Sequence, residues 1–165
     1  MTSHQEIVRR LQAAGHELPR AMPAVATYVP TVTSSFSAGV LLHVAGQGPF
    51  RNGALDFVGR IGRDLTAETA CRSAELVCLN LIAQAAAAAE RQTGAPSLHR
   101  LRCLRLGIFL NCVDGFAELD FIADAASKIV VAAFGDNGQH CRSVVGQPVL
   151  PMGTSVEIDG IFLLD

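Results

Sequence analysis

The sequence predicts a single α+β domain in which two helices lie on one face of a β-sheet. A chain of 165 residues is long enough for one hydrophobic core and short for two. Half of the residues are hydrophobic and only 17% are charged, a balance typical of a compact protein. Apolar patterns follow the order strands, helix, strand, helix, strand, strand, as expected for two β-α-β units.

A short helix is predicted at the N-terminus. Ser3 and Glu6 have the spacing of a capping box, in which the serine caps the helix and the glutamate lies in its first turn. Gly15 is expected to end this helix. Three prolines then keep residues 18–30 in an extended path across the surface.

The first strands are predicted from β-branched and aromatic residues. Residues 31–36 and 40–45 are predicted to form a hairpin joined at a small, glycine-containing turn. Gly46-Gln47-Gly48-Pro49 is expected to break the second strand. Asn52-Gly53 is a strong turn signal, which predicts two further short strands on its two sides.

The central part of the chain is predicted to contain the longest helix and a buried strand. Thr66 is a good N-cap, and Gly94-Ala95-Pro96 ends the helix. Its apolar residues occupy more than one side, which indicates cover on several faces. Residues 101–112 are apolar on both faces, as expected for a central strand. Residues 116–134 are predicted to form a second long helix.

Two β-like segments close the chain, at 139–146 and 150–158, and are predicted to form a hairpin-like or crossover pair. The first contains Arg142 and the second contains Glu157, each between apolar neighbours. A lone charge in an apolar strand is costly to bury unless it meets a partner or a ligand. We therefore place Arg142 and Glu157 at the centre of any functional site.

The predicted helices cover one face of the sheet and leave the other face uncovered. The low charged fraction leaves few residues to solvate a large surface. We therefore expect the second face to be covered by the neighbouring subunit of a ring.

Charge and cysteine usage restrict the function class. A net charge of −2 offers no field that would attract a phosphate backbone, so nucleic acid is disfavoured as a partner. The five cysteines are odd in number and include no C-x-x-C pair, which indicates a reducing compartment. The sequence shows no signal peptide and no membrane span, so we expect a soluble cytoplasmic protein.

Several short motifs, in their order and spacing, resemble the Rid family of YjgF-type reactive-intermediate deaminases. Within it, the chain is similar to the YjgF/chorismate-mutase-like branch labelled endoribonuclease L-PSP. The motifs are Tyr28-Val29-Pro30, Gly46-Gln47-Gly48-Pro49, Asp64-Leu65-Thr66-Ala67-Glu68, Arg142-Ser143, and Leu150-Pro151 with Val156-Glu157-Ile158. This resemblance implies a chorismate-mutase-like domain with a mixed sheet at 18–165, preceded by an N-terminal helical extension at 1–17. It also implies a homotrimer with three ligand sites between subunits, and no cofactor or metal.

The resemblance implies roles for two charged residues. Arg142 matches the family's arginine that grips a substrate carboxylate, a role that suits the parallel donors of a guanidinium. The alternative for Arg142 is an ion pair with Glu157 or Asp159 across the sheet. Glu157 matches a glutamate that positions or activates the hydrolytic water. The alternatives for Glu157 are a structural partner for Arg142 and a surface residue.

The resemblance also implies a set of lining residues. Tyr28 matches a tyrosine near the site and is assigned with Arg142 and Glu157 to the catalytic residues, with packing beside Pro30 as its alternative. Gly46 and Gln47 match a strand end whose backbone lines the site, with a bulge or turn as the alternative. Ser143 completes the Arg-Ser pair and is assigned with it to substrate binding.

The chain departs from the family pattern near Arg142. Val144 stands where active deaminases commonly have a cysteine, and Gly146 stands where they often have an acidic residue. The asparagine expected on the second helix is replaced by Asp120 or Asp124, and we assign Asp124 to the site. Such an aspartate would repel an anionic substrate. His140 shares a strand face with Arg142 by alternation and is a candidate lining residue, with a structural role as its alternative.

Three functions follow from this reading. The first is hydrolytic deamination of reactive enamines or imines derived from amino acids, giving keto acid and ammonia. The second is a non-catalytic trimer that binds a small carboxylated metabolite, which the departures favour. The third is the ribonuclease of the family label, ranked last because the chain has one tyrosine, no tryptophan and no basic run.

Overall fold

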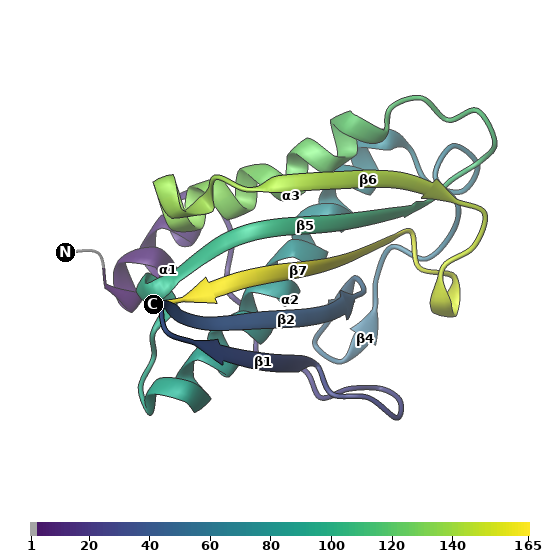
Figure 1. Ribbon diagram of the computed structural model, residues 1–165. Helices are drawn as coiled ribbons and strands as arrows, with labels where there is room; N and C mark the ends of the chain where they lie inside the picture. Colours follow the sequence, from purple (N-terminus) through teal and green to yellow (C-terminus); the bar gives the residue numbers. More distant parts are fainter. Residues whose placement is uncertain (1–2) are drawn as a thin grey trace.

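A computed structural model describes residues 3–165 and shows a β-sheet with helices on one of its faces (Figure 1). The helices are α1 (His4–Ala13), α2 (Ala67–Thr93) and α3 (Leu119–Phe134). The strands are β1 (Thr31–Phe36), β2 (Gly39–Gln47), β3 (Phe50–Arg51), β4 (Ala54–Leu55), β5 (Leu101–Asn111), β6 (Cys141–Gln147) and β7 (Val156–Leu164). Short 3-10 segments cover Leu98–Arg100, Gly135–Gly138 and Pro151–Gly153.

The main sheet has the strand order β1-β2-β7-β5-β6. β5 and β6 run parallel, and the other neighbours run antiparallel. This arrangement confirms the predicted mixed α+β fold. The last two strands are a crossover pair, because β5 lies between them. The hairpin alternative is therefore wrong: β6 reaches the sheet through α3 and pairs beyond β5, and the chain then crosses to the other side of β5 (Figure 1).

The hairpin of β1 and β2 is confirmed, but β2 continues to Gln47, past the end predicted at residue 45. The reason is a shift in register against β7 between Val44 and Gln47, which accommodates Gly46 without ending the strand. The predicted turn at Asn52-Gly53 is also confirmed, and both residues have positive φ, at 51° and 83°. This turn joins β3 to β4.

The ends of α2 follow the predicted signals. The Thr66 hydroxyl accepts a hydrogen bond from the backbone N–H of Thr69 at 3.2 Å, and Gly94 ends the helix with φ 75°. By contrast, α3 begins at Leu119, three residues later than predicted. A turn around Gly115, with φ 74°, precedes the helix, and residues 116–118 connect this turn to the helix in a non-helical conformation.

The hydrophobic core lies between the sheet and the helices. Along β7, buried and partly exposed residues alternate without exception, so Val156, Ile158 and Phe162 face the helices. The ring of Phe162 packs edge-on against Phe134 of α3, with 6.2 Å between centroids. α2 is buried on several sides, as predicted. α1 packs on α3 and contributes the buried Ile7 to the same core.

The opposite face of the sheet carries no helix within residues 3–165 (Figure 1). Val32 and Phe36, which point to this open face from β1, are 54% and 47% exposed. Charged residues occupy the middle of the same face, where Arg105 and Asp159 form an ion pair at 3.3 Å. The boundary between an N-terminal extension and the domain stays a prediction, and residues 1–2 lie outside the described part.

Candidate functional site

Arg142 points from edge strand β6 towards α3, where three polar side chains lie one helical turn apart. Its Nη1 lies 2.7 Å from Asp124 Oδ1 and donates to Ser127 Oγ at 2.9 Å. Its Nη2 lies 3.7 Å from Asp120 Oδ1. The spacing i, i+4, i+7 puts these three residues on one face of the helix. Both candidate aspartates therefore face Arg142, and Asp124 makes the closer contact.

His140 belongs to the same group of side chains. Its Nε2 lies 3.0 Å from Ser127 Oγ, and its Nδ1 lies 2.6 Å from the carbonyl oxygen of Gly138. Because a carbonyl only accepts, Nδ1 of the neutral ring is the donor and Nε2 is the acceptor. Arg142 therefore donates to Ser127, and the Ser127 hydroxyl donates to His140. We call Arg142, Asp120, Asp124, Ser127 and His140 the arginine half-site.

The other residues of β6 follow from strand alternation. Ser143 is exposed and points to the open face of the sheet, away from Arg142. Val144 and Gly146 share the face of Arg142. A Cβ at Gly146 would lie 2.8 Å from Cys112 Sγ, so an acidic side chain does not fit there. The departure at Gly146 is thus a consequence of the local packing.

Glu157 lies on β7 and points to the open face of the sheet. Its carboxylate lies over Gly46 of β2, where a Cβ would collide with it. Burial raises the pKa of Glu157 above its ordinary value, and the nearby Asp159 raises it further. Asp159 itself pairs with Arg105. Neither ion pair that the sequence suggested for Arg142 forms, because Arg142 binds Asp124 on the other face of the sheet.

Tyr28, Gly46 and Gln47 line one small pocket of about 30 Å³, room for about one water molecule. Tyr28 lies in the irregular segment 18–30 and is 46% exposed. With Glu157 beside Gly46, these four residues form what we call the glutamate half-site.

Two amides of α2 hold the walls of this pocket, and neither was predicted to belong to the site. Asn80 Nδ2 donates to the carbonyl oxygens of Gly48 and Phe50 at 3.0 and 2.9 Å. Gln84 Nε2 donates to the Met22 carbonyl oxygen at 2.6 Å. Their sequence signal is two buried polar residues, four apart, in an otherwise apolar helix.

The two half-sites lie apart within one chain. β6 is an edge strand, and β5 and β7 lie between it and β2 (Figure 1). Phe109 of β5 pairs with both Glu157 and Val145, so these residues share the open face. Arg142 is three residues from Val145 along β6 and therefore faces the helices. Arg142 and Glu157 cannot act on one small ligand within a single subunit.

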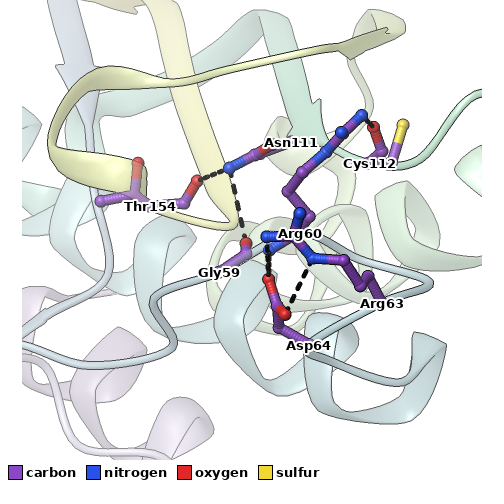
Figure 2. Close-up of polar contacts among 7 residues, drawn as sticks. All are labelled: Gly59, Arg60, Arg63, Asp64, Asn111, Cys112 and Thr154. Atoms are coloured by element: carbon purple, nitrogen blue, oxygen red, sulfur yellow. Dashed lines mark hydrogen bonds and ion pairs between the residues drawn. The ribbon is translucent and has the colours of Figure 1, made fainter.

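A third polar cluster ties the loop before α2 to the ends of β5 and β7 (Figure 2). The Asp64 carboxylate accepts from the Arg60 backbone N–H and the Arg63 guanidinium, each at 2.8 Å. These hydrogen bonds, the Arg63 bond first, lower the pKa of Asp64 to about 2. The cluster is completed by Gly59, Asn111, Cys112 and Thr154. Asp64 therefore has a structural role, because its carboxylate holds the loop before α2.

Within residues 3–165, no group of three or more histidine, cysteine, aspartate or glutamate side chains is placed to hold a metal ion. In the same range, none of the helices combines the length and apolar character needed to cross a membrane.

The fold and the polar groups on its two sides define an α+β protein with a split candidate site, and known proteins share this architecture. The Agrobacterium tumefaciens protein Atu1372, of unknown function, is 33% identical, with a TM-score of 0.85 over 98% of this chain and 94% of that one. A Shewanella oneidensis protein described as a putative endoribonuclease is 29% identical, with a TM-score of 0.82 over 99% and 100% of the two chains. Protein TCP17 of Trypanosoma cruzi is 32% identical over 161 residues, which are 96% of this chain and 94% of TCP17.

The family model described as YjgF/chorismate mutase-like, putative endoribonuclease matches residues 8–162. The chain therefore belongs to the YjgF/chorismate mutase-like family, as its motifs predicted.

Proposed function

We propose that this protein is a cofactor-independent deaminase that hydrolyses reactive imines and enamines derived from amino acids. The observation that carries the proposal is the division of the site. One half offers a guanidinium for a carboxylate, and the other offers a half-buried carboxylate with a raised pKa. The family resemblance supplies the reaction class.

The site requires a second subunit, and we propose a homotrimer. In a ring, the arginine half-site of one subunit meets the glutamate half-site of the next. Two features support this arrangement: the half-sites are separated within one chain, and the open sheet face exposes Val32, Phe36 and Val145. Covering these side chains removes apolar surface from water.

The proposed reaction needs an anchor, a base and water. Arg142 holds the substrate carboxylate through donors that Asp124 and Ser127 leave free. Glu157 of the neighbouring subunit takes a proton from water as the oxygen attacks the iminium carbon. The new C–O bond forms, Glu157 passes this proton to nitrogen, and the C–N bond then breaks as the hydroxyl group gives its proton, by way of Glu157, to the departing ammonia. The sum is one iminium acid plus one water, giving one keto acid and one ammonium ion.

The raised pKa of Glu157 suits this role. A base is most effective when its pKa lies near the working pH. Burial, together with the nearby Asp159, raises the pKa of Glu157 towards that range. Tyr28 and Gln47 line the small pocket beside Gly46, which Glu157 contacts, and they would border the bound substrate.

The test is hydrolysis of freshly generated 2-iminopropionate, followed as release of ammonia and pyruvate. We expect acceleration over the spontaneous rate in the wild type, and loss of it in both Arg142→Ala and Glu157→Gln. Arg9→Ala, whose side chain is 66% exposed on α1, is the matched control and should retain the wild-type rate. No acceleration by folded wild-type protein, across several imino acids, would refute the deaminase.

The shared site gives a second test that depends on assembly. Arg142→Ala and Glu157→Gln subunits, each inactive alone, are coexpressed with different tags. Every mixed ring contains one complete site, so a random mixture should regain about a quarter of the wild-type activity. Light scattering should give the mass of a trimer. Activity that does not return in isolated mixed rings would contradict a site shared between subunits.

A binding protein without catalysis is the second candidate, favoured by one observation. Asp124 and Asp120 already oppose the charge of Arg142, which weakens its grip on a substrate carboxylate. This candidate predicts saturable binding of small carboxylic acids without turnover. The ribonuclease ranks last because the chain has a net charge of −2 and no aromatic–basic surface motif.

A further inference from the structure

The charge around Arg142 restricts which ligand its half of the site accepts. The guanidinium has five N–H donors, and Asp124 and Ser127 occupy donors on Nη1 at 2.7 and 2.9 Å. Donors therefore remain for a ligand carboxylate. Any carboxylate on those donors lies beside two aspartates, so Arg142 with Asp120 and Asp124 presents a net negative charge.

A ligand that is only an anion meets repulsion here, whereas a ligand with a cationic nitrogen next to its carboxylate does not. Asp120 is loosely engaged, at 3.7 Å from Arg142, and its side chain is 88% exposed. It is therefore free to turn towards a positive group. An iminium acid carries such a group on the carbon next to its carboxylate, and the keto acid formed from it does not.

We propose that Asp124, together with Asp120, makes the arginine half-site selective for the zwitterionic imino acid over its keto acid product. This inference rests on the proposed function and names the charge state of the substrate. The aspartates favour the protonated imine, which is the form that water attacks most readily. They also promote departure of the keto acid, which lacks the cation.

Ser127 and His140 support this selectivity by fixing the guanidinium. The Ser127 hydroxyl accepts from Arg142 and donates to His140, whose other nitrogen is held by Gly138. Arg142 therefore keeps one orientation, with Nη1 turned towards Asp124. Ser127 is a positioning residue, because it acts only through Arg142.

The test measures binding of two stable probes, L-alanine as the zwitterion and pyruvate as the anion, by calorimetry or by NMR titration. In the wild type we expect alanine to bind more tightly than pyruvate. In Asp124→Asn, pyruvate should bind roughly threefold to fivefold more tightly, and alanine should not gain. Asp136→Asn, an exposed aspartate beyond α3, is the matched control and should change neither affinity.

Asp120→Asn provides a second variant that cannot disturb packing, and it should shift selectivity in the same direction by less. Equal changes for both probes, or no change in either variant, would overturn the proposal. The proposal would also be overturned if the wild type bound neither probe at millimolar concentration. These outcomes differ from failure of the deaminase itself, which is read from turnover of 2-iminopropionate and not from binding.

Discussion

The two hydrogen bonds from Asn80 allow a quantitative prediction about the glutamate half-site. Asn80 is 7% exposed, and its side chain donates to the backbone carbonyls of Gly48, which lies between β2 and β3, and of Phe50, the first residue of β3. Asn80→Ala removes both donors and leaves two carbonyl oxygens without this partner. The pocket wall beside Gly46 should loosen, and the protein should lose stability.

The size of the loss follows from the contacts. A hydrogen bond contributes about 1 kcal/mol net to the free energy of unfolding, so two contribute about 2 kcal/mol. Alanine is the better helix former, which returns about 0.5 kcal/mol. We expect a net loss of about 1.5 kcal/mol, which lowers the Tm by about 3–6 °C in a chain of this size.

Thermal unfolding and urea titration at one fixed protein concentration measure this loss, because assembly makes stability depend on concentration. Gln92→Ala in the same helix is the control. Its amide makes a longer bond of 3.3 Å to Thr33 at an exposed position, so a change within about 0.5 kcal/mol is expected. A loss for Asn80→Ala that is no larger than the control would show that the amide does not hold the loop.

Three further predictions concern ionisation, packing and thiol reactivity. The pKa of Glu157 is raised in the folded state. The free energy of unfolding of the protein therefore falls as pH rises from about 4.5 towards the folded-state pKa of this residue. Glu157→Gln should therefore stabilise the protein in urea titrations at pH 7 but not at pH 4, and an equal effect at both would contradict this. In Gly138→Ala, the new Cβ would lie 2.6 Å from a backbone oxygen of α3, so thermal unfolding should reveal a loss of about 1–3 kcal/mol; an unchanged Tm would refute the contact. Cys141 is exposed and Cys78 is buried with a raised pKa, so Ellman's reagent should label Cys141 first and Cys78 only after unfolding. Retention of the fast phase in Cys141→Ser would contradict that order.

Local chemistry made most of the fold predictable. Helix α2 begins after Thr66 and ends at Gly94, and Asn52-Gly53 forms the predicted turn. These features were predictable because caps and tight turns depend on residues close in sequence. The position of β5 between β6 and β7 was not predictable from such signals. Strand order depends on which apolar faces meet in the folded chain, and periodicity does not report it.

Some residues of the candidate site could be proposed from the sequence, but the way they are grouped could not. Arg142 and Glu157 stand out as charges in apolar strands, yet the ladder places them on opposite faces of the sheet. The partner of Arg142 depends on how α3 packs against β6. The helical spacing of Asp120, Asp124 and Ser127 did show that these three residues share one helix face, because they are four and three residues apart.

The place of β6 at the edge of the sheet has a consequence for the dynamics of the protein. β6 pairs with one strand, β5, and all of its residues are partly or fully exposed. Amide hydrogens in such a strand exchange with solvent through local openings that leave the core intact. The contacts of Arg142 with α3 fasten β6 at its N-terminal end. Arg142 thus also stabilises its own strand against local opening. Ligand binding at the arginine half-site should therefore slow hydrogen exchange along β6 before it affects β7.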